Sequence, residues 1–247
     1  MVLPLVWRVC AVLVYSSRMA WGCLADRIAA PARRLGAAAA VVLLIAAGVG
    51  PDELRAQLTP QAPEGRALIE RLREGGLVVF FRHADTAGMP CDSLYRIGQR
   101  EGQRNISADG RVQARQIGAA LAALNIPIQE PVLAGPVFRA RDTAEIAFGA
   151  ERVEITDSLL ADDYAGSRGV AWVISEHRRL FATPPQPGLN RVLVGHRTPA
   201  LLSVDGQVSR AGFPEGAAIV MRPVDGSAEV LGVISFVPPP NPGVDRC

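Results

Sequence analysis

The fold is decided by the stretch Leu77-Val78-Val79-Phe80-Phe81-Arg82-His83-Ala84. Its five leading apolar residues predict a buried strand, which ends at an arginine and a histidine. Open α/β sheets bind ligands at the carboxyl edge of their strands, so Arg82 and His83 are expected at such an edge. An unprotonated imidazole is a usable nucleophile, and a guanidinium donates a rigid fork of hydrogen bonds to phosphoryl oxygens.

A later segment, Val192–His196, has the same design, because an apolar run again ends in a histidine. The chain contains only three histidines. If both runs are parallel strands of one sheet, His83 and His196 face each other at its edge. The third, His177, stands beside Arg178 and Arg179 on an expected helix and is expected at the surface.

Composition excludes several classes of function. A formal net charge of +2 over 247 residues gives no reason to expect nucleic-acid binding. No Cys-x-x-Cys pair or zinc-type spacing with histidine is present, so we expect neither a metal nor a cofactor. Cys91 and Cys247 could form a disulfide in an exported protein or remain two free thiols, and both alternatives stay open.

The N-terminal region, residues 1–50, is predicted to be a signal or anchor segment. A 16-residue apolar run, Leu35–Gly50, follows Arg33-Arg34 directly, a pattern typical of a secretory leader. It predicts a bacterial periplasmic or otherwise exported protein, whose membrane contact is confined to this segment. Two questions stay open: whether the leader is cleaved or anchors the chain in the inner membrane through residues 35–50, and whether translation starts at Met1 or Met19.

The remaining chain divides into a linker (51–63), a folded domain (64–237) and a proline-rich tail (238–247). Alternating strands and helices predict an α/β fold, specifically a three-layer α/β/α sandwich with a largely parallel central sheet. The expected strands are 77–81, 132–134, 153–155, 191–194 and a terminal hairpin of 217–221 with 230–236. The expected helices are 64–74, one from about 109, 139–148, 169–181 and a short one from 199.

Two segments add candidate anion-binding groups at helix starts. In Asn105–Ala114 a Ser or Asp side chain can cap a helix whose free backbone N–H groups attract an anion. In Gly135–Glu145 a proline suits a first helical turn, from which Arg139 would project as a phosphate clamp. The polar segment 85–104, which includes Arg104, is expected to form a loop over the pocket and to influence specificity.

Together these segments resemble the histidine phosphatase superfamily, also called the phosphoglycerate mutase-like or RHG-motif family. The four segments that carry the resemblance, in family order, are Arg82-His83-Ala84, Ile106–Ala114, Gly135–Glu145 and Val194-Gly195-His196. The similarity covers about residues 77–222. Two positions depart from the family pattern, since Ala84 replaces the glycine of Arg-His-Gly and Gly135 replaces a serine. Both replacements are small.

The resemblance implies a phosphoglycerate mutase-like fold and assigns roles to individual residues. His83 would become a phosphohistidine, while Arg82, Arg139 and His196 hold the phosphoryl oxygens. The family commonly has a carboxylate proton donor after a mid-chain strand, and Asp162 is the candidate here. Asp163 is the reserve and Glu215 a third choice. The residues expected to bind substrate are Ser107, Asn105 and Arg104.

The expected function is that of an exported, metal-independent phosphomonoesterase acting on a small phosphorylated substrate, such as a phosphosugar or a cell-envelope phosphate. The leader and first motif are also similar, more loosely, to the periplasmic lipopolysaccharide core heptose-phosphate phosphatases. One alternative is a non-catalytic domain that binds phosphate or phosphosugars. A phosphomutase is the other, less favoured because export separates the protein from glycolytic phosphoglycerates.

Overall fold

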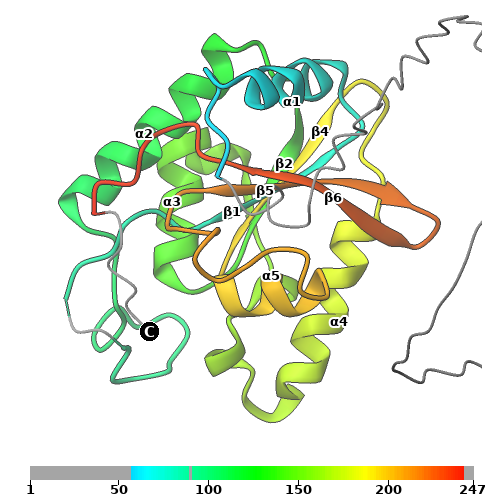
Figure 1. Ribbon diagram of the computed structural model, residues 1–247. Helices are drawn as coiled ribbons and strands as arrows, with labels where there is room; N and C mark the ends of the chain where they lie inside the picture. Colours follow the sequence, from blue (N-terminus) through cyan, green and yellow to red (C-terminus); the bar gives the residue numbers. More distant parts are fainter. Residues whose placement is uncertain (1–56, 89–90, 242–247) are drawn as a thin grey trace, which may run out of the picture. The chain divides into compact units, whose positions relative to one another are not determined.

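The computed structural model describes residues 57–88 and 91–241 (Figure 1). These residues belong to one unit of the chain, Ala47–Cys247. The expected leader, the first six linker residues and the last six tail residues lie outside the described part. Within that part no helix is long and apolar enough to cross a membrane.

Five α-helices and six strands form within the described residues. In chain order they are α1 Pro63–Glu74, β1 Val78–Arg82, α2 Ala108–Ala123, β2 Ile128–Ala134, α3 Phe138–Phe148, β3 Val153–Ile155, α4 Gly169–Ala182, β4 Asn190–Gly195, α5 Arg197–Ser203, β5 Ala218–Val224 and β6 Ser227–Ile234. Four short 3₁₀ helices join them: η2 Ala150–Arg152, η3 Asp157–Leu159, η4 Asp162–Tyr164 and η5 Gly166–Arg168.

The strands form one sheet in the order β3-β2-β4-β1-β5-β6. The four strands from β3 to β1 are parallel, and the hairpin of β5 and β6 adds two antiparallel strands beside β1. The largely parallel sheet is therefore confirmed. All carboxyl ends of the parallel strands lie at one edge, where their following loops meet.

Helices cover both faces of the sheet, which confirms the three-layer architecture (Figure 1). Strand β1 is buried throughout, so its side chains alternate between two cores. Val79 and Phe81 pack with α1, α2 and α3, whereas Val78 and Phe80 pack with α4 and α5. A buried strand of this kind explains the continuous apolar run from which the fold was predicted.

The predicted elements are confirmed, with boundaries shifted by a few residues. The largest shift is in β2, which begins at Ile128 instead of 132, because the polar residues Gln129 and Glu130 hide its first half from an apolar pattern. The end of the expected linker is also engaged in the fold. Leu58 exchanges backbone hydrogen bonds with residues 233 and 235 beside β6.

Candidate active site

The register between β1 and β4 brings the two strand-end histidines together. Arg82 is paired with Gly195 in the parallel ladder, so the next residue of each strand, His83 and His196, is its neighbour. The backbone N–H of His83 donates to the Gly195 carbonyl at 3.0 Å, and the two imidazole centroids are 5.5 Å apart. The expectation that these histidines face each other is confirmed.

Both imidazoles are buried and neutral. Burial, together with the positive charges of Arg139 and Arg82, holds the pKa of His83 well below its ordinary value. Burial, followed by the charge of Arg139, does the same to the pKa of His196. Nδ1 of His83 lies 2.9 Å from the Ala84 carbonyl, which can only accept a hydrogen bond. The proton is therefore on Nδ1, and Nε2 of His83 carries a free electron pair.

Four buried guanidinium groups line the pocket that contains the two histidines. They are those of Arg82, Arg104, Arg139 and Arg197. The pocket has a volume of about 130 Å³. Arg139 projects from the first turn of α3, which follows β2, as the sequence predicts. Positive charge concentrated in so small a space favours a compact anion over a neutral ligand.

A buried carboxylate, Asp92, attaches the loop of residues 85–104 to this cluster. Arg139 donates from Nη1 to Asp92 at 2.7 Å, and the Tyr164 hydroxyl donates to the same oxygen at 2.5 Å. The other oxygen accepts the backbone N–H of Arg104 at 2.7 Å. Burial alone would raise the pKa of Asp92, but the hydrogen bond from Tyr164 and the charge of Arg139 together lower it. The loop thus lies at the pocket as expected.

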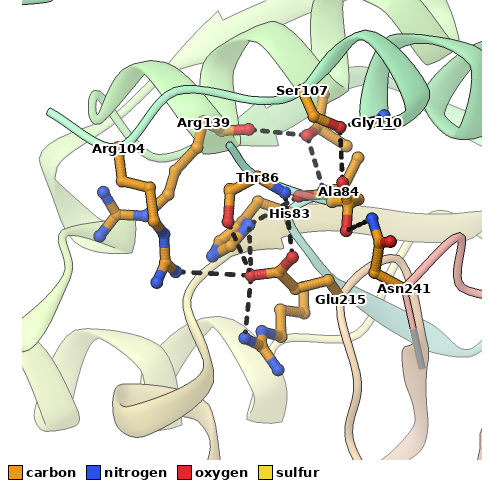
Figure 2. Close-up of polar contacts among 12 residues, drawn as sticks. His83, Ala84, Thr86, Arg104, Ser107, Gly110, Arg139, Glu215 and Asn241 are labelled. Carbon is orange, nitrogen blue, oxygen red and sulfur yellow. Dashed lines mark hydrogen bonds and ion pairs between the residues drawn. The ribbon is translucent and has the colours of Figure 1, made fainter. Parts of the chain in front are cut away.

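Glu215, in the turn before β5, contacts two of the arginines that line the pocket (Figure 2). Its carboxylate accepts hydrogen bonds from Arg82 at 3.2 Å and Arg104 at 3.4 Å. It also accepts from both the backbone N–H and the hydroxyl of Thr86, at 3.0 and 3.1 Å. Its Oε1 is 4.0 Å from Nδ1 of His83. Since Glu215 acts as an acceptor in all these contacts, it is poorly placed to donate a proton to a leaving group.

Asp162 and Asp163 both line the pocket, on η4. Burial by the surrounding protein raises the pKa of Asp163 to about 6, and the charges of Asp162 and Asp92 add to the increase while that of Arg139 opposes it. Asp163 is nevertheless exposed to solvent. A carboxyl group with this pKa is half protonated at pH 6 and about one-tenth protonated at pH 7, far more than an ordinary aspartic acid.

Of the three residues expected to bind substrate, only Arg104 lies in the pocket. Ser107 is the N-cap of α2, where its hydroxyl accepts the Gly110 N–H at 2.8 Å and donates to Asp85. Asn105 bonds to loop residues, including the Gln103 carbonyl at 2.9 Å. Ser107 and Asn105 do not line the pocket, and the start of α2 is satisfied by its own cap, so a role of these two residues in substrate binding stays a prediction.

His177 is fully buried, so its expected surface position is wrong. It lies on the sheet-facing side of α4, against Phe80 and Phe181. Nδ1 bonds to the Val173 carbonyl at 2.8 Å, whereas Nε2 has no hydrogen-bond partner among the described residues. The neighbouring arginines suggested solvent, but they are on other faces of the helix, which a count by helical period would have shown.

Sequence reasoning missed six pocket residues, which are Cys91, Asp92, Tyr95, Ala161, Arg197 and Thr198. Arg197 could have been found, because it follows His196 directly at the same sheet edge. Asp92 and Tyr95 come from the irregular loop, and no periodic pattern indicates which of its side chains turn inward.

The small residues at the two departures from the family pattern fit closely packed positions. Ala84 is completely buried, and its N–H donates to the Thr143 hydroxyl at 2.9 Å. A side chain at Gly135 would meet the Leu159 carbonyl, since a Cβ built there lies only 2.3 Å from that oxygen. The local packing therefore excludes a larger residue at Gly135 without moving η3.

Two further predictions concern metals and cysteines. In residues 57–88 and 91–241 no three His, Cys, Asp or Glu side chains are grouped to hold a metal ion. Cys91, which lines the pocket, is disulfide-bonded. The other three cysteines all lie outside the described residues, so the specific pairing with Cys247 stays a prediction.

Residues 78–164 match the family model of the histidine phosphatase superfamily (branch 1). The match confirms the resemblance inferred from the motifs. It includes Arg82, His83, Arg139 and both candidate acids of η4, whereas His196 lies beyond its end. None of the curated proteins matches the chain.

Several solved structures are similar to this chain. The protein histidine phosphatase SixA complexed with tungstate is 19% identical, with a TM-score of 0.44, over 64% of this chain and 96% of that chain. A putative phosphohistidine phosphatase SixA from Nakamurella multipartitia is 22% identical, with a TM-score of 0.42, over 67% and 99%. The mycobacterial glucosyl-3-phosphoglycerate phosphatase is 17% identical, with a TM-score of 0.44, over 66% and 100%.

Proposed function

Because residues 78–164 of this chain are those of a histidine phosphatase superfamily member, we propose that the protein is a phosphomonoesterase that works through a phosphohistidine on His83. The observation that carries the proposal is the position of His83, which lines an arginine-rich pocket with its Nδ1 2.9 Å from the Ala84 carbonyl. A neutral imidazole with its proton on Nδ1 presents the Nε2 electron pair to a pocket lined by arginine.

The reaction runs in two steps. Nε2 of His83 attacks phosphorus, a P–N bond forms, and the P–O bond to the leaving group breaks. Water then attacks the phosphohistidine, releasing inorganic phosphate and returning the electron pair to Nε2. Arg82, Arg139 and Arg104 stabilise the charge on the equatorial oxygens during both transfers. Nε2 of His196 is buried without a hydrogen-bond partner among the described residues, and a phosphoryl oxygen would provide one.

The leaving oxygen requires a proton, for which we assign Asp163 instead of Asp162. Both residues line the pocket, but the pKa of about 6 makes Asp163 the better donor near neutral pH. The same carboxylate, once deprotonated, accepts a proton from the attacking water in the second step. Proton transfer thus balances over the cycle.

The substrate is a small phosphorylated molecule. A pocket of about 130 Å³ is small and open to solvent, so we expect the phosphoryl group to bind inside it and a larger leaving group to extend out of it. A phosphosugar or a cell-envelope phosphate meets this requirement. Export is supported by the apolar run after Arg33-Arg34 and by the disulfide at Cys91, because disulfides persist mainly in oxidising compartments.

Hydrolysis of an aryl phosphate by wild type and by His83→Ala tests this function. The wild type should turn over, and the variant should lose at least about 10³-fold in kcat, because it lacks the group that forms the covalent intermediate. Glu229→Gln, which breaks an exposed ion pair with Arg222 in the β5–β6 hairpin, is the matched control and should behave as wild type. Near-normal activity of a folded His83→Ala protein would refute the proposal, and so would an inactive wild type.

A further inference from the structure

We propose that Glu215 is a positioning residue that acts through His83, by stabilising the positive charge which the imidazole gains when Nε2 attacks phosphorus. This role rests on the proposed function. It is distinct from proton donation, the role for which the sequence made Glu215 a third choice.

The geometry places a negative charge on the side of the ring opposite the attacking atom. Nδ1 of His83 donates to the Ala84 carbonyl at 2.9 Å, and Oε1 of Glu215 lies 4.0 Å from the same nitrogen (Figure 2). Nε2 therefore remains directed to the pocket. The carbonyl fixes the tautomer, and the carboxylate supplies the full charge that a carbonyl lacks.

The carboxylate is fixed in this place by the residues around it. Both of its oxygens accept hydrogen bonds from Thr86, and Oε1 also accepts from Arg82. Its side chain is only 12% exposed. An attraction between opposite charges about 4 Å apart is several-fold stronger at such a site than in water, and a preorganised charge costs no reorganisation during the reaction.

The charge balance of the first step shows when this attraction acts. Before attack, His83 is neutral and Glu215 has no cation at Nδ1 to stabilise. When Nε2 gives its electron pair to phosphorus, the ring keeps the proton on Nδ1 and becomes an N-phosphoryl imidazolium. The leaving group departs with the P–O electron pair and a proton from the acid. The attraction between Glu215 and His83 is thus gained in the transition state, which raises kcat.

The same carboxylate should oppose the binding of an anion. Glu215 stands beside Arg82 and Arg104, which line the phosphate pocket, and its negative charge repels an incoming dianion. Removing only the charge should therefore weaken catalysis without weakening phosphate binding. A residue that merely held the arginines in place would affect both, because displaced guanidinium groups would bind phosphate poorly.

Glu215→Gln tests this difference, with kcat for an aryl phosphate and the competitive Ki of inorganic phosphate measured on the same preparations. We expect kcat to fall by about 10- to 100-fold and Ki to stay the same or decrease up to about tenfold. Glu215→Asp keeps the charge with one methylene fewer and should recover part of kcat. Glu229→Gln removes a carboxylate from an arginine pair outside the pocket and is the matched control.

Three results would overturn the proposal. One is unchanged kcat in Glu215→Gln, another is a parallel loss of kcat and phosphate affinity, and the third is equal damage by Gln and Asp. Thermal unfolding of each variant shows whether it is folded. If Glu215→Gln does not fold, kcat and the Ki of phosphate are compared between Glu215→Asp and wild type instead. Failure of the proposed function would look different, because His83→Ala would then match wild type.

Discussion

The imidazoles of His83 and His196 remain neutral at working pH because the protein around them opposes a second positive charge. Burial and the arginines of the pocket both lower their pKa values. The same arginines that would bind the phosphoryl group therefore also keep the nucleophile in its reactive form. In contrast, burial raises the pKa of Asp163, so that an acid and a nucleophile coexist in one pocket.

If Asp163 is the proton donor, the rate of hydrolysis should depend on pH and on the leaving group. A donor must be protonated, so kcat/KM for an alkyl phosphate should decline as pH rises through about 6, the pKa of this group. Asp163→Asn should remove that decline and slow alkyl phosphate hydrolysis by about 10²- to 10⁴-fold. Aryl phosphate hydrolysis should slow far less, because an aryl oxide leaves without a proton. The measurement is a pH–rate profile with both esters.

Asp162→Asn is the matched control, because Asp162 neighbours Asp163 and lines the same pocket. It should preserve the dependence on leaving group. If Asp162→Asn instead shows the selective loss with alkyl esters, the residue favoured by sequence is the donor. Equal losses on both esters in Asp163→Asn would mean that Asp163 supports the loop or positions substrate.

The sequence predicted the helices and strands, because these depend on the periodicity of apolar residues and on residues that are neighbours along the chain. Apolar runs ending in His83 and His196 predicted two strands, and the parallel register then brought their ends together without further information. The ion pairs that complete the pocket join segments far apart in sequence, such as Asp92 with Arg139 and Glu215 with Arg82. No local pattern encodes such pairs, because only the tertiary fold brings their two partners together.

His177, on helix α4, should make the stability of the fold depend on pH. Burial lowers the pKa of His177 to about 4, whereas the unfolded value is near 6.5. Below pH 6.5 the unfolded chain binds a proton that the folded chain does not, so this residue should lower the free energy of unfolding by about 2 kcal/mol between pH 7 and pH 5. His177→Phe should remove this contribution to the pH dependence of the free energy of unfolding, as measured by urea unfolding at the two pH values.

The two other histidines also make the free energy of unfolding depend on pH, so the His177 variant should keep part of that dependence. His83 and His196 also have lowered pKa values and titrate in the same direction, so the His177→Phe protein should still lose some stability at pH 5. An unchanged difference between pH 7 and pH 5 would show that His177 does not contribute. The ring of phenylalanine fits the contacts with Phe80 and Phe181, so the variant is expected to fold.

For the whole molecule, the predicted architecture of one sheet between two helical layers is confirmed, because strand burial and the alternation of strands with helices are global patterns. The leader 1–50 and the remaining cysteines lie outside the described residues, so export stays a prediction. Cys91, which lines the pocket, also bears on export, because its disulfide persists mainly in an oxidising environment.

A β-lactamase reporter fused to the C-terminus of the full chain tests export, because the reporter protects a bacterium only when it reaches the periplasm. The fusion should confer resistance. Leu43→Arg with Leu44→Arg introduces two charges into the apolar run and should abolish the resistance without changing the folded domain. A fusion that is abundant but gives no protection would show that the chain remains in the cytoplasm.

During turnover, His83 should carry the phosphoryl group as a covalent intermediate. The most direct measurement is to quench the enzyme in alkali during steady-state hydrolysis of a phosphate ester and to locate the phosphate by peptide mass spectrometry. We predict an acid-labile, alkali-stable phosphate on His83 that is absent from His83→Ala. An enzyme that turns over rapidly yet never carries phosphate on His83, or carries it on another residue, would contradict a mechanism through a phosphohistidine on His83.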